Sequence, residues 1–253
     1  MFEEIWSKIK RTNPQLHWAV FISSPEILDD IELGWRYKSD QVQLNTNIYY
    51  MNYKNQLVLT GAIDDVGAPI RATSGKSYRL GLEIDADIKL NEQFSIKSNA
   101  AFSTNKNEDF TAPIDGSLLY LGNTPLSFSP NVIVGNMVMY QPSNNLQISF
   151  LSKYVGEQFM SNLNSGVSKL DVLDSYFTSD LNFVYEIATK KIFDAIIISG
   201  LINNIFNTEY IDRGYYYTYD DTWSTPGSVS TLDGAGYYPQ ATRNFLVGVT
   251  LKF

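Results

Sequence analysis

Hydrophobic and polar residues alternate along much of the chain, most clearly in the segment SYRLGLEIDADIKL at residues 77–90. The apolar positions of this segment are Tyr78, Leu80, Leu82, Ile84, Ala86, Ile88 and Leu90. The positions between them include the charged residues Arg79, Glu83, Asp85, Asp87 and Lys89. Because successive side chains of a β-strand point to opposite faces, this alternation predicts a strand with one apolar face and one polar face.

A period of two recurs along the chain and predicts about nine strands in total. The other segments are residues 29–38, 41–50, 93–104, 131–140, 146–154, 176–188, 192–206 and 244–253. Many of these segments reach ten residues or more, whereas strands of soluble domains usually have about five or six. Strands of this length are typical of tilted strands that cross a membrane.

The connections between these segments alternate between short and long. Short turns are expected at residues 39–40, 91–92, 143–145 and 189–191, and long polar or glycine-rich loops at about 59–74, 106–128, 158–174 and 210–240. All short turns then lie at one end of the sheet, as in outer-membrane barrels, where the short turns are periplasmic and the long loops extracellular. The predicted fold class is therefore an all-β, antiparallel transmembrane β-barrel segment in the cell outer membrane.

Aromatic residues gather near both ends of the predicted strands, as in the two aromatic girdles of a membrane barrel. Those at the short-turn end are Phe94, Tyr140, Phe193 and Phe253, and those near the opposite end are Tyr50, Tyr78, Tyr154 and Phe177. Two alternatives stay open. A soluble or surface-anchored all-β binding module would also alternate, with shorter strands and more frequent turn signals. A small porin-like barrel is the other alternative.

Composition removes several functional classes. The formal net charge is −8 and the 19 Lys and Arg residues are scattered, so nucleic-acid binding is not expected. The chain has no cysteine and a single histidine, His17, which leaves little material for thiolate metal sites or histidine catalysis. We therefore expect no enzyme activity and no cofactor. No run of about 18 apolar residues predicts a transmembrane helix.

Three stretches together resemble a known family. They are SPEILDDIELGWRYKSDQVQLNTNIYYMNYKNQLVLTGAIDDVG, GLINNIFNTEYIDRGYYY and YYPQATRNFLVGVTLKF. They resemble the C-terminal part of the barrel of TonB-dependent outer-membrane receptors, with the strongest likeness to the iron-siderophore receptors of Bacteroidetes-like bacteria. The resemblance covers residues 24–253.

This resemblance implies a 22-stranded barrel filled by an N-terminal plug domain, which engages the TonB system and releases ligand inward. About nine strands are incomplete relative to that barrel, and neither a plug domain nor a signal peptide is recognised. We therefore expect a C-terminal fragment: residues 25–253 are a barrel portion, and residues 1–24 are an atypical segment, either a short helix or unstructured. Its expected partners are a ferric siderophore or similar ligand, the lipid bilayer and, only through the missing plug, TonB.

The last long loop holds the candidate ligand-binding residues. They are Arg213, Tyr215, Tyr216, Tyr217, Asp220, Asp221 and Trp223. Aromatic faces and an arginine suit a planar, anionic ligand. The alternative is that the tyrosines pack the loop on itself and form part of the outer girdle. The acidic pairs Asp64-Asp65 and Asp220-Asp221 lack the spacing of a calcium loop, so no metal site is predicted.

The closing segment, NFLVGVTLKF, alternates to the last residue. Its apolar positions are Phe245, Val247, Val249, Leu251 and Phe253. By resemblance, a terminal strand that ends on an aromatic residue is what the outer-membrane assembly machinery recognises, so these five residues are a candidate assembly signal. In the preceding element, INNIFNTEY, the residues Asn203, Asn204 and Asn207 are expected to form hydrogen bonds within the barrel wall.

Overall fold

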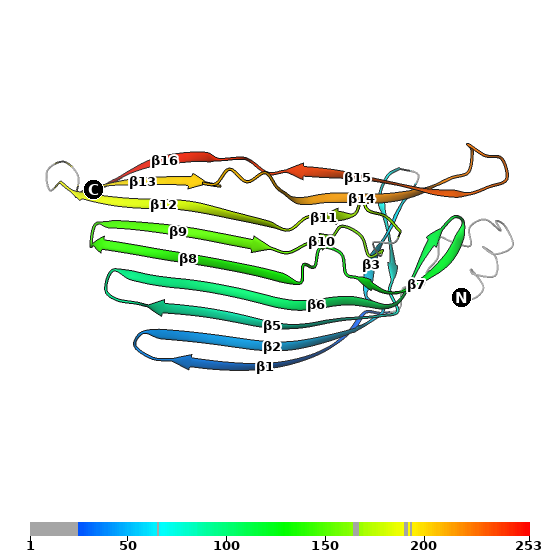
Figure 1. Ribbon diagram of the computed structural model, residues 1–253, viewed down its shortest axis with the longest axis horizontal. Coiled ribbons are helices and arrows are strands. Elements are labelled where there is room, and N and C mark those ends of the chain that lie inside the picture. Colours follow the sequence, from blue (N-terminus) through cyan, green and yellow to red (C-terminus); the bar gives the residue numbers. More distant parts are fainter. Residues whose placement is uncertain (1–24, 65, 164–166, 190–191, 193) are drawn as a thin grey trace.

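The computed structural model describes residues 25–253 except 65, 164–166, 190, 191 and 193, and over this range it contains β-strands and no helix (Figure 1). The described residues therefore include no helix that could cross a membrane. The atypical segment 1–24 with His17, and also Asp65 and Phe193, lie outside the described residues.

Among the described residues the main sheet has ten strands, nine of which follow one another in order, each antiparallel to the next, while β7 (Ser117–Pro125) pairs with β6 beside this path. The nine are β1 (Ile27–Lys38), β2 (Val42–Lys54), β5 (Lys76–Lys89), β6 (Phe94–Ile114), β8 (Val132–Ser143), β9 (Leu146–Val155), β12 (Tyr176–Ala188), β13 (Ala195–Asn203) and β16 (Asn244–Lys252). The predicted all-β, antiparallel fold of about nine long strands is confirmed. β1 and β16 lie at the two opposite edges (Figure 1).

The remaining strands form hairpins between the long strands. They are β3 (Leu57–Ile63), β4 (Pro69–Thr73), β7 (Ser117–Pro125), β10 (Gln158–Phe159), β11 (Val172–Leu173), β14 (Ile211–Asp221) and β15 (Ser230–Pro239). All of them lie toward one end of the main sheet, at the right in Figure 1, whereas the short turns and the C-terminus lie at the other end. The predicted alternation of short and long connections is therefore confirmed.

The structure corrects one detail of these connections, because the segments expected to be loops are largely paired strands. One of these hairpins, β6–β7, has a sequence signal for its turn that the prediction did not use. Asp115 has φ 50° and Gly116 has φ 69°, which are the left-handed angles of a two-residue type I′ turn. An Asp-Gly pair favours this turn because aspartate and glycine tolerate positive φ better than most residues do.

One face of the main sheet is apolar from edge to edge. Cross-strand pairing places Leu33 beside Ile48, Ile48 beside Leu82, and Leu82 beside Phe102. Within the described part of the chain no second layer covers this face, so Leu33 is 73% exposed and Val247 is 76% exposed. A soluble β-sandwich buries such a face against a second sheet. The architecture therefore contradicts the alternative of a soluble module.

Aromatic residues pair across neighbouring strands at both ends of the main sheet. At the short-turn end, the rings of Phe94 and Tyr140 stack with centroids 4.4 Å apart. Toward the hairpin end, the rings of Tyr50 and Tyr78 lie 6.3 Å apart. The two predicted groups of aromatic residues are thus present at the two ends of the strands, among the described residues.

A small core lies at the hairpin end of the structure, where the last part of β6 packs with the other hairpins. The residues at 57–74, 106–128, 158–174 and 210–240, here called the loop layer, bury Val58, Phe110, Ala112 and Leu163 against one another. Tyr216 packs against the same cluster. The four connections are therefore packed together in one layer, since these residues come from all four of them.

Polar contacts tie the loop layer together across large sequence separations. The Asn162 amide donates to the Leu59 carbonyl at 2.9 Å, and the Asn107 amide donates to Asn162 Oδ1 at 3.3 Å. At the tip of β6–β7, the Asp115 N–H donates to Thr231 Oγ1 at 2.7 Å, and the Thr231 N–H donates back to Asp115 Oδ1 at 2.8 Å. These bonds hold the β6–β7 and β14–β15 hairpins together.

The asparagines of INNIFNTEY bond within the sheet wall, as predicted. Asn203 Nδ2 donates to Asn244 Oδ1 on β16 at 2.8 Å. Asn204 is only 4% exposed, has φ 50°, and its side chain exchanges two hydrogen bonds of 2.8 Å with the Thr208 backbone. Asn207 Oδ1 accepts the Arg243 N–H at 3.0 Å. The corner after β13 is therefore fixed by side-chain contacts.

Candidate functional site

The face of the main sheet opposite to the apolar face is polar. On β5 and β6, Lys97 Nζ lies 3.4 Å from Asp87 Oδ2, and on β1 and β2 the Asn47 amide donates to Glu32 at 3.0 Å. The side chains of Asp87 and Lys97 are each about half exposed, so this ion pair contributes little stability by itself. The side chains on this face are therefore suited to contact with water or with another polar protein surface.

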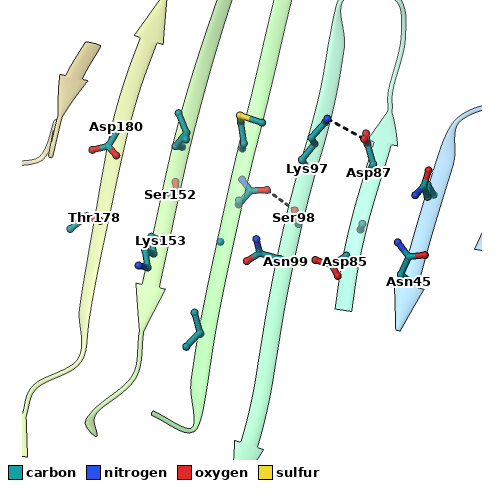
Figure 2. Close-up of a pocket in the computed structure, with 17 residues that line it drawn as sticks. Asn45, Asp85, Asp87, Lys97, Ser98, Asn99, Ser152, Lys153, Thr178 and Asp180 are labelled. Carbon is teal, nitrogen blue, oxygen red and sulfur yellow. Dashed lines mark hydrogen bonds and ion pairs between the residues drawn. The ribbon is translucent and has the colours of Figure 1, made fainter. Parts of the chain in front are cut away.

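A hollow of about 560 Å³ lies on this polar face (Figure 2). Its charged and amide lining includes Asp85, Asp87, Lys97, Asn99, Lys153 and Asp180. The predicted charges of segment 77–90 thus face the hollow at Asp85 and Asp87, whereas Arg79 bonds Ser129 Oγ at 3.0 Å nearer the loop layer. Both carboxylates and lysine side chains line the hollow, so it is better suited to contact a surface that carries charges of both signs than to bind a purely anionic ligand.

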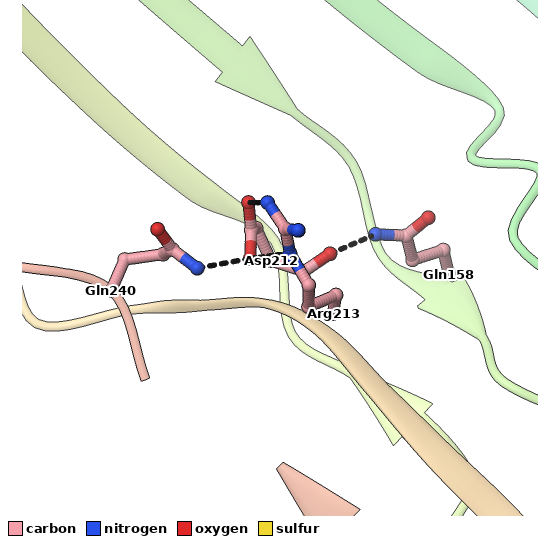
Figure 3. A network of polar contacts seen from close by, with 4 residues as sticks. All are labelled: Gln158, Asp212, Arg213 and Gln240. Atoms are coloured by element: carbon pink, nitrogen blue, oxygen red, sulfur yellow. Dashed lines mark hydrogen bonds and ion pairs between the residues drawn. The ribbon is translucent and has the colours of Figure 1, made fainter. Parts of the chain in front are cut away.

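The base of the β14–β15 hairpin holds a network centred on Asp212 (Figure 3). Arg213 Nε donates to Asp212 Oδ1 at 3.2 Å and its Nη2 donates to Oδ2 at 3.3 Å. Gln240 donates to Asp212 Oδ1 at 2.6 Å, and Gln158 donates to the Asp212 carbonyl at 3.3 Å. The hydrogen bond and charge of Asp212 raise the pKa of Arg213. The charge of the candidate Arg213 is therefore already paired.

The three candidate tyrosines are divided between two faces of the hairpin. Tyr216 faces the loop-layer core, and its hydroxyl donates to Asp233 at 3.3 Å. Tyr215 and Tyr217 lie on the opposite face, where their rings are 6.3 Å apart and almost parallel. Tyr219 continues that row, 6.4 Å beyond Tyr217. Sequence reasoning left Tyr219 out of the candidate set, although its period-two spacing from Tyr217 was a readable signal.

The other three candidates lie toward the hairpin tip. Asp220 accepts the Thr231 hydroxyl at 2.7 Å across the hairpin. Asp221 accepts the N–H groups of Trp223 and Ser224, each at 3.0 Å, and hydrogen bonds from Ser224 hold the pKa of Asp221 below its usual range. Trp223 is 68% exposed. The two carboxylates therefore hold the turn, and the indole is free to contact a ligand.

Asp64, the described member of the first acidic pair, has a structural role, as Asp220 and Asp221 do. Asp64 Oδ1 accepts the N–H groups of Val66 and Ala68 at 3.0 and 2.8 Å, which closes a tight turn. Among the described residues, no three His, Asp or Glu side chains gather as a metal-binding group.

Sequence reasoning missed a buried acidic contact in the loop layer. Asp171 is fully buried, and its Oδ2 accepts the Ser161 hydroxyl at 2.6 Å, whereas its Oδ1 has no hydrogen-bond partner. Burial raises the pKa of Asp171, and the charge of Asp233 raises it further. Asp233 accepts hydrogen bonds from Ser168 and Tyr216. A single aspartate in a long polar segment carried no signal for this burial.

The stability of the loop layer is expected to fall as pH rises. The folded-state pKa of Asp171 is raised, so its stabilising contribution is present below the unfolded pKa and is lost as pH rises through the folded pKa. Asp171→Asn cannot ionise, so the stability of the loop layer should no longer fall as pH rises in this variant. Limited proteolysis of the loop layer between pH 4 and 7.5 measures this. An unchanged pH profile in Asp171→Asn would contradict the account.

Four residues of the candidate assembly signal lie on one face of β16, and the fifth, Phe253, follows directly after this strand. Phe245, Val247, Val249, Leu251 and Phe253 are 76%, 76%, 64%, 43% and 85% exposed. Their side chains continue the apolar face, because Phe245 pairs with Ile202 and Val249 pairs with Ile198 on β13. The predicted alternation of β16 is confirmed, and its role in assembly stays a prediction.

A protein-family model described as "TonB dependent receptor-like, beta-barrel" matches residues 8–205. A search of curated proteins found no match. Solved structures with a similar fold include the ferric-catecholate import receptor Fiu of E. coli K12, at 15% identity and a TM-score of 0.62 over 91% of this chain. The ferric yersiniabactin uptake receptor FyuA of Yersinia pestis has 19% identity and a TM-score of 0.60 over 88%. At such low identity, these structures show a shared fold.

The copper transporter OprC is similar to the same degree, with 15% identity and a TM-score of 0.60 over 90% of this chain. The chain corresponds to only 28%, 29% and 31% of Fiu, FyuA and OprC, respectively. It therefore spans less than a third of the length of the solved structures it matches.

Proposed function

The chain belongs to the TonB-dependent receptor-like β-barrel family, and on this basis we propose that it takes part in TonB-dependent uptake of a ferric siderophore or a similar scarce nutrient. The chain is a C-terminal barrel portion of such a receptor, its location is the outer membrane, and it is not an enzyme. The apolar face of the main sheet accordingly contacts lipid, and the polar face lines the lumen.

The observation that supports this role best is the continuous apolar face, together with the grouping of all hairpins at one end. Lipid requires every backbone polar group to be paired, and neighbouring strands of a barrel satisfy this requirement.

The comparisons define the transported nutrient less narrowly than the family. Structures with similar folds are named for ferric catecholate, ferric yersiniabactin and copper. The siderophore and the Bacteroidetes-like origin come from the sequence resemblance and are part of the proposal.

The polar face supports a second part of the proposal, concerning the contents of the lumen. The hollow lined by Asp85, Lys97 and Asp180 presents charges of both signs. Such a surface suits salt bridges and hydrogen bonds to a folded plug domain. We expect TonB to act through that plug, and not through direct contact with the strands described here. The apolar row of β16 is the proposed contact for the assembly machinery.

The β14–β15 hairpin is the proposed ligand-contacting element of the loop layer. All seven candidates lie on it or at its tip: Arg213, Tyr215, Tyr216, Tyr217, Asp220, Asp221 and Trp223. Because Tyr216 faces the loop-layer core, a ligand held among the hairpins would meet Tyr216 and not the opposite row. The paired charge of Arg213 would have to separate from Asp212 before it could bind an anion.

Uptake in the native host tests this function. Replacing residues 212–238 by a short Gly-Ser linker removes no strand of the main sheet, and is expected to lower uptake of the transported nutrient about tenfold or more, because loop contacts supply binding free energy. The probes are iron-55 citrate, iron-55 catecholate and iron-55 hydroxamate complexes, and copper. Abundance in the outer membrane is the control. If deleting the whole gene changed the uptake of none of these probes, the proposed function would be wrong.

A further inference from the structure

The face of β14 that points away from the loop-layer core carries a row of aromatic rings. Tyr215, Tyr217 and Tyr219 of β14, together with Trp223 just beyond its end, form this row, here called the aromatic ladder. Successive ring centroids are 6.3, 6.4 and 6.2 Å apart, and successive planes differ by 22°, 19° and 7°. The ladder is therefore a row of nearly parallel rings with an almost constant spacing.

Glycines on the neighbouring strand β15 make the ladder flat. Tyr215 lies opposite Gly236, and Tyr217 lies opposite Gly234. A side-chain carbon added at Gly234 would lie only 2.6 Å from the ring of Tyr217, and one added at Gly236 would overlap the ring of Tyr215. Both rings thus lie across the backbone of β15, an arrangement in which an aromatic side chain covers a strand glycine. Tyr215 and Trp223 are 51% and 68% exposed, and Tyr217 and Tyr219 are partly exposed, so every ring of the ladder keeps some surface that a ligand can reach.

The charges near the ladder disfavour an anionic ligand on this face. The hairpin segment 210–240 contains one basic residue, Arg213, and four carboxylates, at Asp212, Asp220, Asp221 and Asp233. Arg213 is paired with Asp212, and the pKa of Asp221 is lowered, so that a negative charge stands at the Trp223 end of the ladder. A negatively charged surface repels anions at short range, unless free cations intervene.

We propose that the aromatic ladder binds an extended chain of neutral sugars. The C–H faces of pyranose rings are apolar and pack on flat aromatic faces, and their hydroxyl groups can donate to carboxylates such as Asp221. A row of similar, evenly spaced rings offers the same contact several times, which suits a polymer better than a compact chelate. Three of the seven proposed ligand contacts, Tyr215, Tyr217 and Trp223, belong to the ladder. Because the ladder faces away from the core among the hairpins, a sugar chain bound there would lie on the other side of β14 from a ligand held among the hairpins, and this site goes beyond the proposed transport function.

Calorimetric titration of the whole protein, purified in detergent, tests this site with three neutral linear probes: cellohexaose, maltohexaose and laminarihexaose. At least one hexasaccharide is expected to bind saturably, and more tightly than its disaccharide. Tyr217→Ala should weaken that binding about tenfold, whereas Tyr217→Phe should preserve it, since the ring makes the contact and the hydroxyl does not. Tyr219→Ala provides a second test if Tyr217→Ala does not fold.

Tyr120→Ala is the matched control, because Tyr120 is a 64% exposed tyrosine on another hairpin, β6–β7, and lies outside the ladder. This variant should bind as the unmodified protein does. Absence of saturable binding by all three hexasaccharides, affinity independent of chain length, or unchanged binding in folded ladder variants would overturn the proposal. Binding only to vesicles that contain outer-membrane glycolipid would also overturn it. If the purified protein binds a hexasaccharide although deleting its gene changes the uptake of none of the nutrient probes, the sugar site stands and the transport function does not.

Discussion

Leu82→Arg is expected to leave most of the protein unfolded and outside the membrane. Leu82 lies in the middle of β5, on the apolar face, between Ile48 and Phe102. Arginine on the lipid face of a barrel costs about 2–4 kcal/mol near the bilayer midplane. The folded fraction is measured by heat-modifiable migration on gels of the outer-membrane fraction.

Glu83→Arg provides the matched control for this substitution. Glu83 is the next residue on the same strand, but its side chain lies on the polar face, beside Asn47. An arginine there stays in the lumen and should change the folded fraction by far less than Leu82→Arg does. Equal loss for both variants would contradict the assignment of the two faces.

The second large effect is expected at Asn204, where β13 gives way to the corner before β14. The backbone N–H of Asn204 donates to Asp180 at 2.7 Å, and its side chain satisfies both backbone groups of Thr208. Asn204→Ala keeps the left-handed φ of 50°, which costs an alanine about 1–2 kcal/mol, and leaves two backbone groups unpaired. With about 1 kcal/mol for each lost hydrogen bond, we expect a loss of about 3–4 kcal/mol in urea unfolding.

Asn204→Gly separates the two causes. Glycine adopts the left-handed region freely, so this variant should regain the backbone part of the loss but not the hydrogen bonds. It should therefore fall between Asn204→Ala and the unmodified protein. Stability of Asn204→Gly equal to that of Asn204→Ala would show that backbone conformation contributes nothing at this corner.

The long strands were predictable because each one carries its own evidence. In β5, six apolar positions in strict alternation predict both the strand and its two faces. The hairpins of the loop layer were harder to predict, because their strands bury their side chains against one another and not against lipid. In β3, for example, Val58 packs with Leu163, which lies more than 100 residues away. No local pattern records such a contact.

The candidate site was predictable as a segment but not as a surface. Alternation separates Tyr216 from Tyr215 and Tyr217, but it does not show which side the loop-layer core covers. That answer depends on Leu163, which comes from a different connection. The sequence also did not show that Arg213 is paired with its neighbour Asp212, or that Asp171 is buried. In each case the missing information is a contact made by the fold.

The central claim is that the even-numbered residues of β5 contact lipid and the odd-numbered residues face the lumen. The chain contains no cysteine, so a single introduced cysteine at each position from 79 to 88 gives one unambiguous site for a nitroxide label. Spin-label accessibility of the protein in its membrane is the most direct test, because oxygen concentrates in lipid and a nickel chelate stays in water. We predict high oxygen accessibility at positions 80, 82, 84, 86 and 88, and high nickel accessibility at the positions between them. Absence of a period of two, or the opposite phase, would contradict the account.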